Sequence, residues 1–267
     1  MYSKLFVLSL FQFAFVQFGE CAELFAVNNS KYPEIDRLLY YGKKDDKAKA
    51  YNLTMELNNK QPNDPDVLYR LAKACHCLYD IKRRENDKEA SEKYILQGIE
   101  YAKKAMELAP NNSNTQKWYG ICVGANGQFQ SLKEKIKCGV VFRDQMNKAI
   151  QMAPKDFTLY SLKGRYQYEI SKLSFFERKI AVLIVSDLDE PTAEDAIANC
   201  LKAEELAPAP WKENQLLIAK CYIEAGEYAK AVQWLDKAKA IPVVSYEDEN
   251  SQKEINELLS EWKSYRE

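Results

Sequence analysis

The chain has 267 residues, 46% of them hydrophobic and 29% charged, which is the usual balance of a soluble globular protein. Its 38 basic and 39 acidic side chains leave a net charge of −1, so no global field attracts nucleic acid or membranes, and no nucleic-acid partner is expected. Any electrostatic binding must come from local patches.

Residues 1–22 carry the one strongly apolar run of the chain, LFVLSLFQFAFVQF at positions 5–18. This length suits the apolar region of a signal peptide and is short for a membrane span, which takes about 20 residues. We interpret it first as a signal peptide, next as a short membrane anchor, and last as a helix packed on the rest of the chain. The seven cysteines, odd in number and without metal-type spacing, instead indicate a reduced, intracellular protein. The two arguments point to different compartments.

Residues 23–62 predict N-terminal helices, with Asp45 as the cap of the second one. Residues 63–267 predict one long helical domain, which Asp64 opens as an N-cap in front of Pro65. No pattern of alternating apolar residues joined by a hairpin turn is present, so the chain is expected to be all-α.

A repeating pattern runs through this helical domain. A small residue is followed by an apolar residue four positions later, by Ala after three more, and by Pro after five more, or after four in the last copy. The prolines that end the copies are 48, 44, 54 and 34 residues apart, at Pro62, Pro110, Pro154, Pro208 and Pro242. They divide the domain into repeats at about 63–110, 111–154, 155–208 and 209–242, followed by a capping helix at 247–265. The copy at residues 23–62 is a possible degenerate repeat.

Residues 157–184 form the longest helical pattern of the chain. Along one side, Arg165, Lys172 and Lys179 recur every seven residues. On a single helix they drift by only about 20° per step and lie about 10.5 Å apart, which predicts one straight basic stripe.

The last repeat has the pattern of two helices joined by a tight turn. Gly226 supplies the turn, Ala219 and Ala231 lie where the helices cross, and Pro242 ends the second helix. This stretch resembles a tetratricopeptide (TPR) repeat, which has a period of 34 residues. The whole chain is therefore expected to be a TPR-like solenoid of antiparallel helix pairs, with lengthened repeats and a concave surface that binds other proteins. The structural residues of the repeats are Gly164, Ala196, Ala203, Pro208, Ala219, Tyr222, Gly226, Ala231 and Ala238.

No motif for catalysis, metal binding or a cofactor stands out. His76, the only histidine, lies between two cysteines, but neighbouring residues of a helix point about 100° apart and do not close easily on one ion. The glycines at 120, 124 and 127 fit a helix end better than a phosphate-binding loop. A TPR adaptor for chaperone tails is also disfavoured, because no repeat has the required Lys and Asn pair.

A more specific likeness lies in the runs GRYQYEISKLSFFERKIA (164–181) and EPTAEDAIANCLKAEELAPAPWKENQLLIAKCYIEAGEYAKAVQWLDKA (190–238). Their ordered segments Leu173–Lys179, Ala203–Leu206 and Lys220–Tyr222 resemble the regulator of microtubule dynamics family. The resemblance covers roughly residues 30–260. It implies a TPR-like protein without catalytic activity that associates with microtubules and spindle poles in the cytoplasm. Some members instead sit at organelle membranes such as the endoplasmic reticulum through an N-terminal segment, with a lipid-binding role.

Two functions follow as hypotheses. A microtubule-binding scaffold would use basic clusters against the acidic surface and tails of tubulin: the stripe Arg165, Lys172 and Lys179, and two secondary patches, Lys82, Arg83 and Arg84, and Lys133, Lys135 and Lys137. The alternative for each cluster is that it only forms the solvent-exposed face of a helix and binds no partner. A membrane-anchored organelle-contact or lipid-binding module would instead use an apolar groove, with Phe175, Phe176 and residues 182–185 as its lining.

Overall fold

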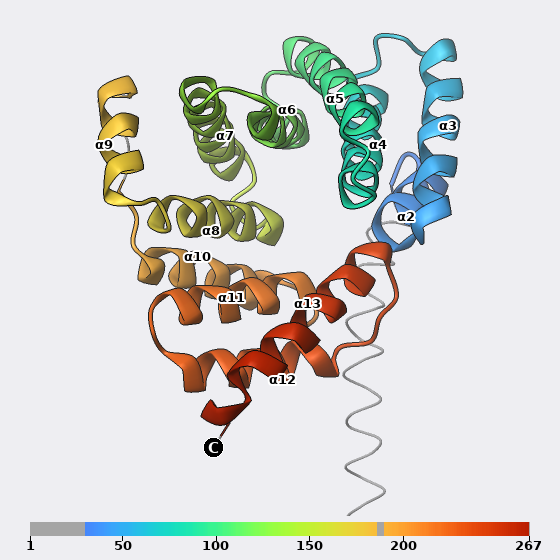
Figure 1. Cartoon of the computed structure of the whole chain (residues 1–267). Coiled ribbons are helices and arrows are strands. Elements are labelled where there is room, and N and C mark those ends of the chain that lie inside the picture. The colour runs from blue at the N-terminus through green and yellow to red at the C-terminus, as the bar shows by residue number, and fades with distance from the viewer. Residues whose placement is uncertain (1–29, 186–189, 267) are drawn as a thin grey trace, which may run out of the picture.

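The computed structural model describes residues 30–185 and 190–266, so the apolar run at 5–18 lies outside the described residues. Every regular element within those two ranges is helical, and the expected all-α, TPR-like fold is confirmed (Figure 1). The α-helices are α2 Pro33–Tyr41, α3 Lys44–Lys60, α4 Pro65–Arg84, α5 Lys88–Leu108, α6 Ser113–Asn126, α7 Leu132–Met152, α8 Phe157–Ser171, α9 Phe175–Ile184, α10 Ala193–Leu206, α11 Lys212–Glu224, α12 Tyr228–Ala240 and α13 Tyr246–Trp262; the 3₁₀ turns are η1 Gly127–Phe129 and η2 Lys263–Tyr265.

Polar side chains fix where the helices begin. The Asp64 carboxylate accepts the backbone N–H of Asp66 at 2.8 Å, which confirms the predicted start of α4. The prediction that Asp45 caps α3 is wrong, because that helix is capped at Lys43, whose backbone N–H donates to the Asp46 carboxylate at 2.8 Å. Asp45 instead lies in the first turn, where its charge favours the helix dipole.

Small residues allow the paired helices to pack closely. A Cβ atom on Gly164 of α8 would overlap the Cys200 Sγ atom and lie 3.0 Å from the carbonyl oxygen of Ala196, both on α10. In the last pair Ala219 and Ala231 are completely buried. The other alanines of the repeat pattern, Ala196, Ala203 and Ala238, are also completely buried, while Tyr222 is half-buried and Pro208 is exposed.

The turn of the last pair needs a glycine. Gly226 has a φ of +77°, in the left-handed region that a residue with a Cβ atom enters only at a cost. Its backbone N–H donates to the carbonyl oxygen of Ile223, and that of Glu227 to Tyr222, which closes the end of α11. Two residues beyond α12, Pro242 prevents the helix from continuing.

The predicted continuous helix at 157–184 is wrong. The structure ends α8 at Ser171, with Lys172 as its C-cap, and begins α9 at Phe175. The physical reason is a capping box, in which the Ser174 hydroxyl accepts the Glu177 N–H at 3.3 Å and the Glu177 carboxylate accepts the Ser174 N–H at 3.0 Å. Such a box favours a new helix start over continuation of the old helix.

The two ends of the array meet. The backbone N–H of Tyr246, at the start of α13, donates to the carbonyl oxygen of Gly42 between α2 and α3, at 3.2 Å. Lys43 pairs with Glu249 at 2.8 Å, and the fully buried Lys47 pairs with Glu247 at 2.9 Å. We call these contacts the clasp. It turns an open solenoid into a closed ring of helices, with α13 reaching α2 in Figure 1.

Candidate functional site

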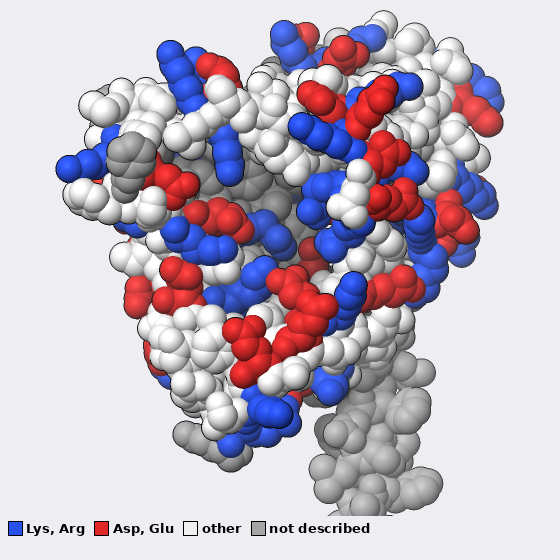
Figure 2. All heavy atoms as spheres, in the orientation of Figure 1, with Lys and Arg blue, Asp and Glu red and all other residues white. Residues whose placement is uncertain are grey.

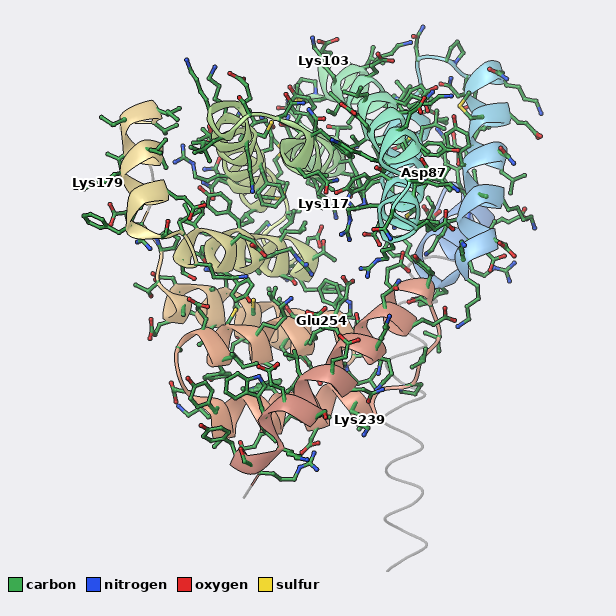
Figure 3. All side chains as sticks on the ribbon, viewed as in Figure 1. Asp87, Lys103, Lys117, Lys179, Lys239 and Glu254 are labelled. Atoms are coloured by element: carbon green, nitrogen blue, oxygen red, sulfur yellow. The ribbon has the colours of Figure 1, made fainter. Side chains whose placement is uncertain are left out.

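The three residues of the predicted basic stripe lie on different segments. Arg165 is in α8 and lies 3.6 Å from the Glu213 carboxylate of α11, Lys172 caps the end of α8, and Lys179 is in α9. A straight stripe with even spacing is therefore wrong, because the break at 172–174 separates its members. Figure 3 shows Lys179 at the outer edge of the molecule.

The secondary patch at the end of α4 is neutralised by its own neighbours. Arg83 and Arg84 both donate to the Asp80 carboxylate, at 2.6 and 2.7 Å, and Lys82 pairs with Glu85 at 2.8 Å. Burial alone would raise the pKa of Asp80, but the two guanidinium groups lower it below its usual value. These three cations are less free to bind an outside acidic group.

The patch at the start of α7 is more open. Lys133 and Lys135 are exposed and have no ion pair within the described residues, whereas Lys137 pairs with Glu134 at 2.8 Å. Because α7 packs against α9 (Figure 1), the structure brings this patch close to the helix that carries Lys179. The charge of Lys135 reaches Glu177 of α9, where it adds to the hydrogen bonds from Ser174 in lowering the carboxyl pKa. The sequence analysis treated the two patches as separate.

Apolar side chains of α9 face solvent. Phe175 is 75% exposed, Leu183 86% and Val182 41%, while Ala181 on the opposite face is buried. The prediction that these residues line a concave groove is wrong for Phe175, Val182 and Leu183. Only one face of α9 packs on the array, so the other face is left uncovered by the described residues.

The inner side of the ring holds a residue that the sequence analysis missed. Lys73 is only 6% exposed, and its Nζ atom has no hydrogen-bond partner among the described residues. It lies 2.8 Å from the centre of the Tyr40 ring and 5.6 Å from that of Trp118. The signal was a lysine in the middle of the small and apolar run LAKACHCL.

His76 lies in the same region, packed between the rings of Tyr79 and Trp118 at 5.4 and 6.0 Å. Burial lowers the pKa of His76 to about 4 and raises the pKa of the neighbouring Cys75 thiol to about 12. These groups are therefore neutral at physiological pH. Within residues 30–185 and 190–266, no three His, Cys, Asp or Glu side chains are placed to hold a metal ion.

Ion pairs line much of the inner side. Lys117 of α6 is 2.8 Å from Asp156, and Lys220 of α11 is 2.7 Å from Glu254 of α13. The space-filling view shows the surface hollowed between the two halves of the ring, with basic and acidic side chains on its walls (Figure 2). Among the described helices, none combines the length and the apolar character that crossing a membrane requires.

Comparisons with known proteins agree with this architecture. A thermophilic TPR protein of Thermus thermophilus has a similar structure, with a TM-score of 0.54, 14% sequence identity, and coverage of 83% of this chain and 91% of that one. Mouse regulator of microtubule dynamics protein 2 is 34% identical over 217 residues, which are 81% of this chain and 52% of the relative. Mouse regulator of microtubule dynamics protein 1 is 32% identical over 212 residues, with coverage of 79% and 68%.

The chain thus spans about half the length of the type 2 relatives that it matches. The profile of the family described as Regulator of microtubule dynamics protein 1-3 matches residues 32–263, which include every helix from α2 to α13. This chain belongs to the regulator of microtubule dynamics protein 1–3 family.

Proposed function

We propose that the chain is a non-catalytic TPR-like scaffold that associates with microtubules and helps to regulate microtubule dynamics and chromosome segregation at the spindle. Relatives that are 34% and 32% identical over 81% and 79% of the chain are named regulators of microtubule dynamics. A ring of helix pairs offers inner and outer surfaces to protein partners, which is the usual output of this architecture. Its working place is then the cytoplasm and the cytoskeleton.

The residues that we propose to contact microtubules lie on the neighbouring helices α7 and α9. We name Lys133, Lys135 and Lys179 the α7–α9 lysines. They are exposed and, within the described residues, form no ion pair. An exposed cation that is not held in an ion pair is free to contact an acidic surface such as that of tubulin, and salt weakens such contacts by screening them.

The test is microtubule co-sedimentation of the triple variant Lys133→Glu, Lys135→Glu, Lys179→Glu. We expect at least about tenfold weaker binding at low salt, because three attractive charges become repulsive. The fold should persist, since Glu is nearly as good a helix former as Lys. Circular dichroism checks this point.

The matched control is the variant Lys82→Glu, Arg83→Glu, Arg84→Glu, which makes the same change of charge on residues that already have acidic partners. It should weaken co-sedimentation much less. If the folded α7–α9 variant co-sediments like the parent protein at every salt concentration, these lysines do not bind microtubules. A further variant with Arg165→Glu and Lys172→Glu then tests the rest of the predicted stripe.

A membrane-anchored organelle-contact or lipid-binding module is the second candidate. The observation that favours it is the uncovered apolar face of α9, with Phe175, Val182 and Leu183 exposed. Exposed aromatic and aliphatic side chains beside a cation are typical of helices that lie in a membrane interface. If the full chain stays with membranes after a high-salt wash, the result supports the membrane-bound module. If salt releases it, the result supports the microtubule scaffold.

A further inference from the structure

The described residues contain four lysines that are more than nine-tenths buried: Lys47, Lys73, Lys117 and Lys212. Three of them are bonded. Lys47 donates to the Leu39 carbonyl at 2.9 Å, Lys117 to Asp156 at 2.8 Å, and Lys212 to the Ala238 carbonyl at 2.9 Å. Lys73 alone among these four has neither a hydrogen bond nor an ion pair within the described residues.

A buried ammonium group without a hydrogen-bond acceptor is costly, so its presence needs an explanation. The Tyr40 and Trp118 rings attract it through their π faces, but such contacts accept no hydrogen bond. Lys73 lies on the side of α4 that faces α2 and α6. The Tyr40 ring that covers its Nζ atom is itself 48% exposed, in the last turn of α2.

The surroundings of Lys73 face the inner side of the ring. Burial raises the pKa of Tyr40, and the charges of Lys117 on α6 and of Asp156 before α8 also act on it, so these two residues lie near Tyr40. Figure 3 shows Lys117 near the centre of the view, on the inner side of the array. Because Tyr40 is half-exposed and its ring covers Lys73 Nζ, displacement of this one ring would open Lys73 to a ligand.

We propose that the inner side of the ring binds an acidic segment of a partner protein, with one glutamate or aspartate carboxylate held by the ammonium group of Lys73 between the Tyr40 and Trp118 rings. The carboxylate supplies the missing acceptor and counter-ion. The two rings then pack against the methylene groups of the same acidic side chain.

The charge count favours a carboxylate over a phosphate monoester. Lys73 offers one unpaired positive charge, and its neighbour Lys117 is already neutralised by Asp156. A doubly charged phosphate would keep one charge unpaired in a partly desolvated site. The lining also disfavours an acyl chain, since it would strip water from ion pairs such as Lys220–Glu254.

The inference does not depend on microtubule association, so its test uses no microtubules. The probe is a fluorescein-labelled octaglutamate peptide, followed by fluorescence polarisation on the full chain, with an octaglutamine peptide as the neutral control. We expect octaglutamate to bind and octaglutamine not to bind. Lys73→Met, which keeps most of the length of the side chain and removes its charge, should weaken octaglutamate binding at least about tenfold.

The matched control is Lys103→Met, which removes the same charge from the outer side of α5, where Figure 3 shows the residue. It should change the dissociation constant less than about twofold, because exposed charges contribute little. A folded Lys73→Met variant that binds octaglutamate as the parent does would overturn the proposal.

A second variant supplies the carboxylate from the chain itself. A glutamate carboxylate at position 40 reaches about as far from the backbone as the centre of the present tyrosine ring, which lies 2.8 Å from Lys73 Nζ. Tyr40→Glu should therefore abolish peptide binding, although Lys73 remains, and should raise the melting temperature. Unchanged peptide binding by Tyr40→Glu contradicts the assignment.

The pH profile gives a readout that a purely structural lysine would not produce. Burial lowers the pKa of Lys73 to about 7, and the groups that act on or face it are Asp36 and Tyr40 of α2, Lys47 of α3, Cys77 of α4 and Lys117 of α6. Below this pH the ammonium form is ready to bind. Above it, binding must take up a proton, so affinity should fall by up to about tenfold per pH unit.

A flat profile between pH 6.5 and 9 would count against Lys73 as the anchor. Vesicles of phosphatidylcholine with and without phosphatidic acid complete the test. If binding to the phosphatidic acid vesicles depends on Lys73 while octaglutamate does not bind, the ligand is a lipid and the proposal of an acidic protein segment is wrong.

Discussion

Two neighbouring helix pairs, α8–α10 and α11–α12, both pack through buried small residues but use stretches of chain of different length. The pair α11–α12 lies in the interval of 34 residues from Pro208 to Pro242, with 13 residues in each helix. The pair α8–α10 occupies 54, and its 20 additional residues correspond to positions 172–191, between the end of α8 and the Thr192 cap of α10. Helix α9 lies within this insertion. The crossing therefore depends on a few small inward residues, and chain length outside it is free to vary.

The largest effect is expected for Ala231→Trp in the pair α11–α12, which tests whether small inward residues determine the helix crossing. Ala231 is completely buried in α12, so a tryptophan has no room and must push the helices apart. We expect a loss of unfolding free energy above the ~1–3 kcal/mol usual for overpacking, measured by urea denaturation. Lys230→Trp, one position earlier on the exposed side, is the control. A melting temperature within a degree of the parent would show that the helices do not cross at this residue.

The next test asks whether the interrupted pair is packed as tightly. Gly164→Ala places a methyl group against Cys200 Sγ and the Ala196 carbonyl, which is backbone and yields little. The expected loss is about 1–3 kcal/mol. Gly139→Ala is the matched control, since its nearest atom would be Tyr166 Cε2 at 3.9 Å. That control should gain about 0.5–1 kcal/mol from the better helix propensity of Ala. Equal effects of the two changes would mean that the insertion loosens the crossing.

The smallest effect is expected in the insertion itself. Leu183 is 86% exposed, so Leu183→Ser should alter the unfolding free energy by no more than about 0.5 kcal/mol. Leu235→Ser in the regular pair, where the leucine is completely buried, should cost several times as much. A large loss from Leu183→Ser would indicate that α9 packs its exposed face on something in solution.

Local patterns allowed much of the helical architecture to be predicted. Asp64 was predicted as a cap because a short polar side chain before a helical run satisfies free N–H groups, and its carboxylate accepts such a bond. Gly226 was identified as a turn because only glycine enters its conformation freely. The division of the chain into repeats, and the binding role of each basic patch, stay predictions.

Two features were not predicted from the sequence: a local helix break, and a buried lysine whose surroundings depend on distant contacts. The seven-residue spacing of Arg165, Lys172 and Lys179 predicted one helix because it takes no account of Ser174. The capping box at Ser174 favours a new helix start over continuation of the first helix. Lys73 looks like any helical lysine until α2 and α6 close over it. The lack of a hydrogen-bond acceptor for Lys73 results from the packing of α2, α4 and α6 together. It therefore cannot be predicted from the residues next to Lys73 in the sequence.

The clasp changes how the molecule should open. In an open solenoid the terminal repeats fray first and independently, because each contacts only one neighbour. Here α2–α3 and α13 hold each other through Gly42–Tyr246 and Lys47–Glu247, contacts that join residues about 200 positions apart. Amide hydrogens near both ends should therefore exchange with solvent together, in one cooperative event, although they belong to opposite ends of the chain. Within residues 30–185 and 190–266, the ring has no free end at which unfolding can begin.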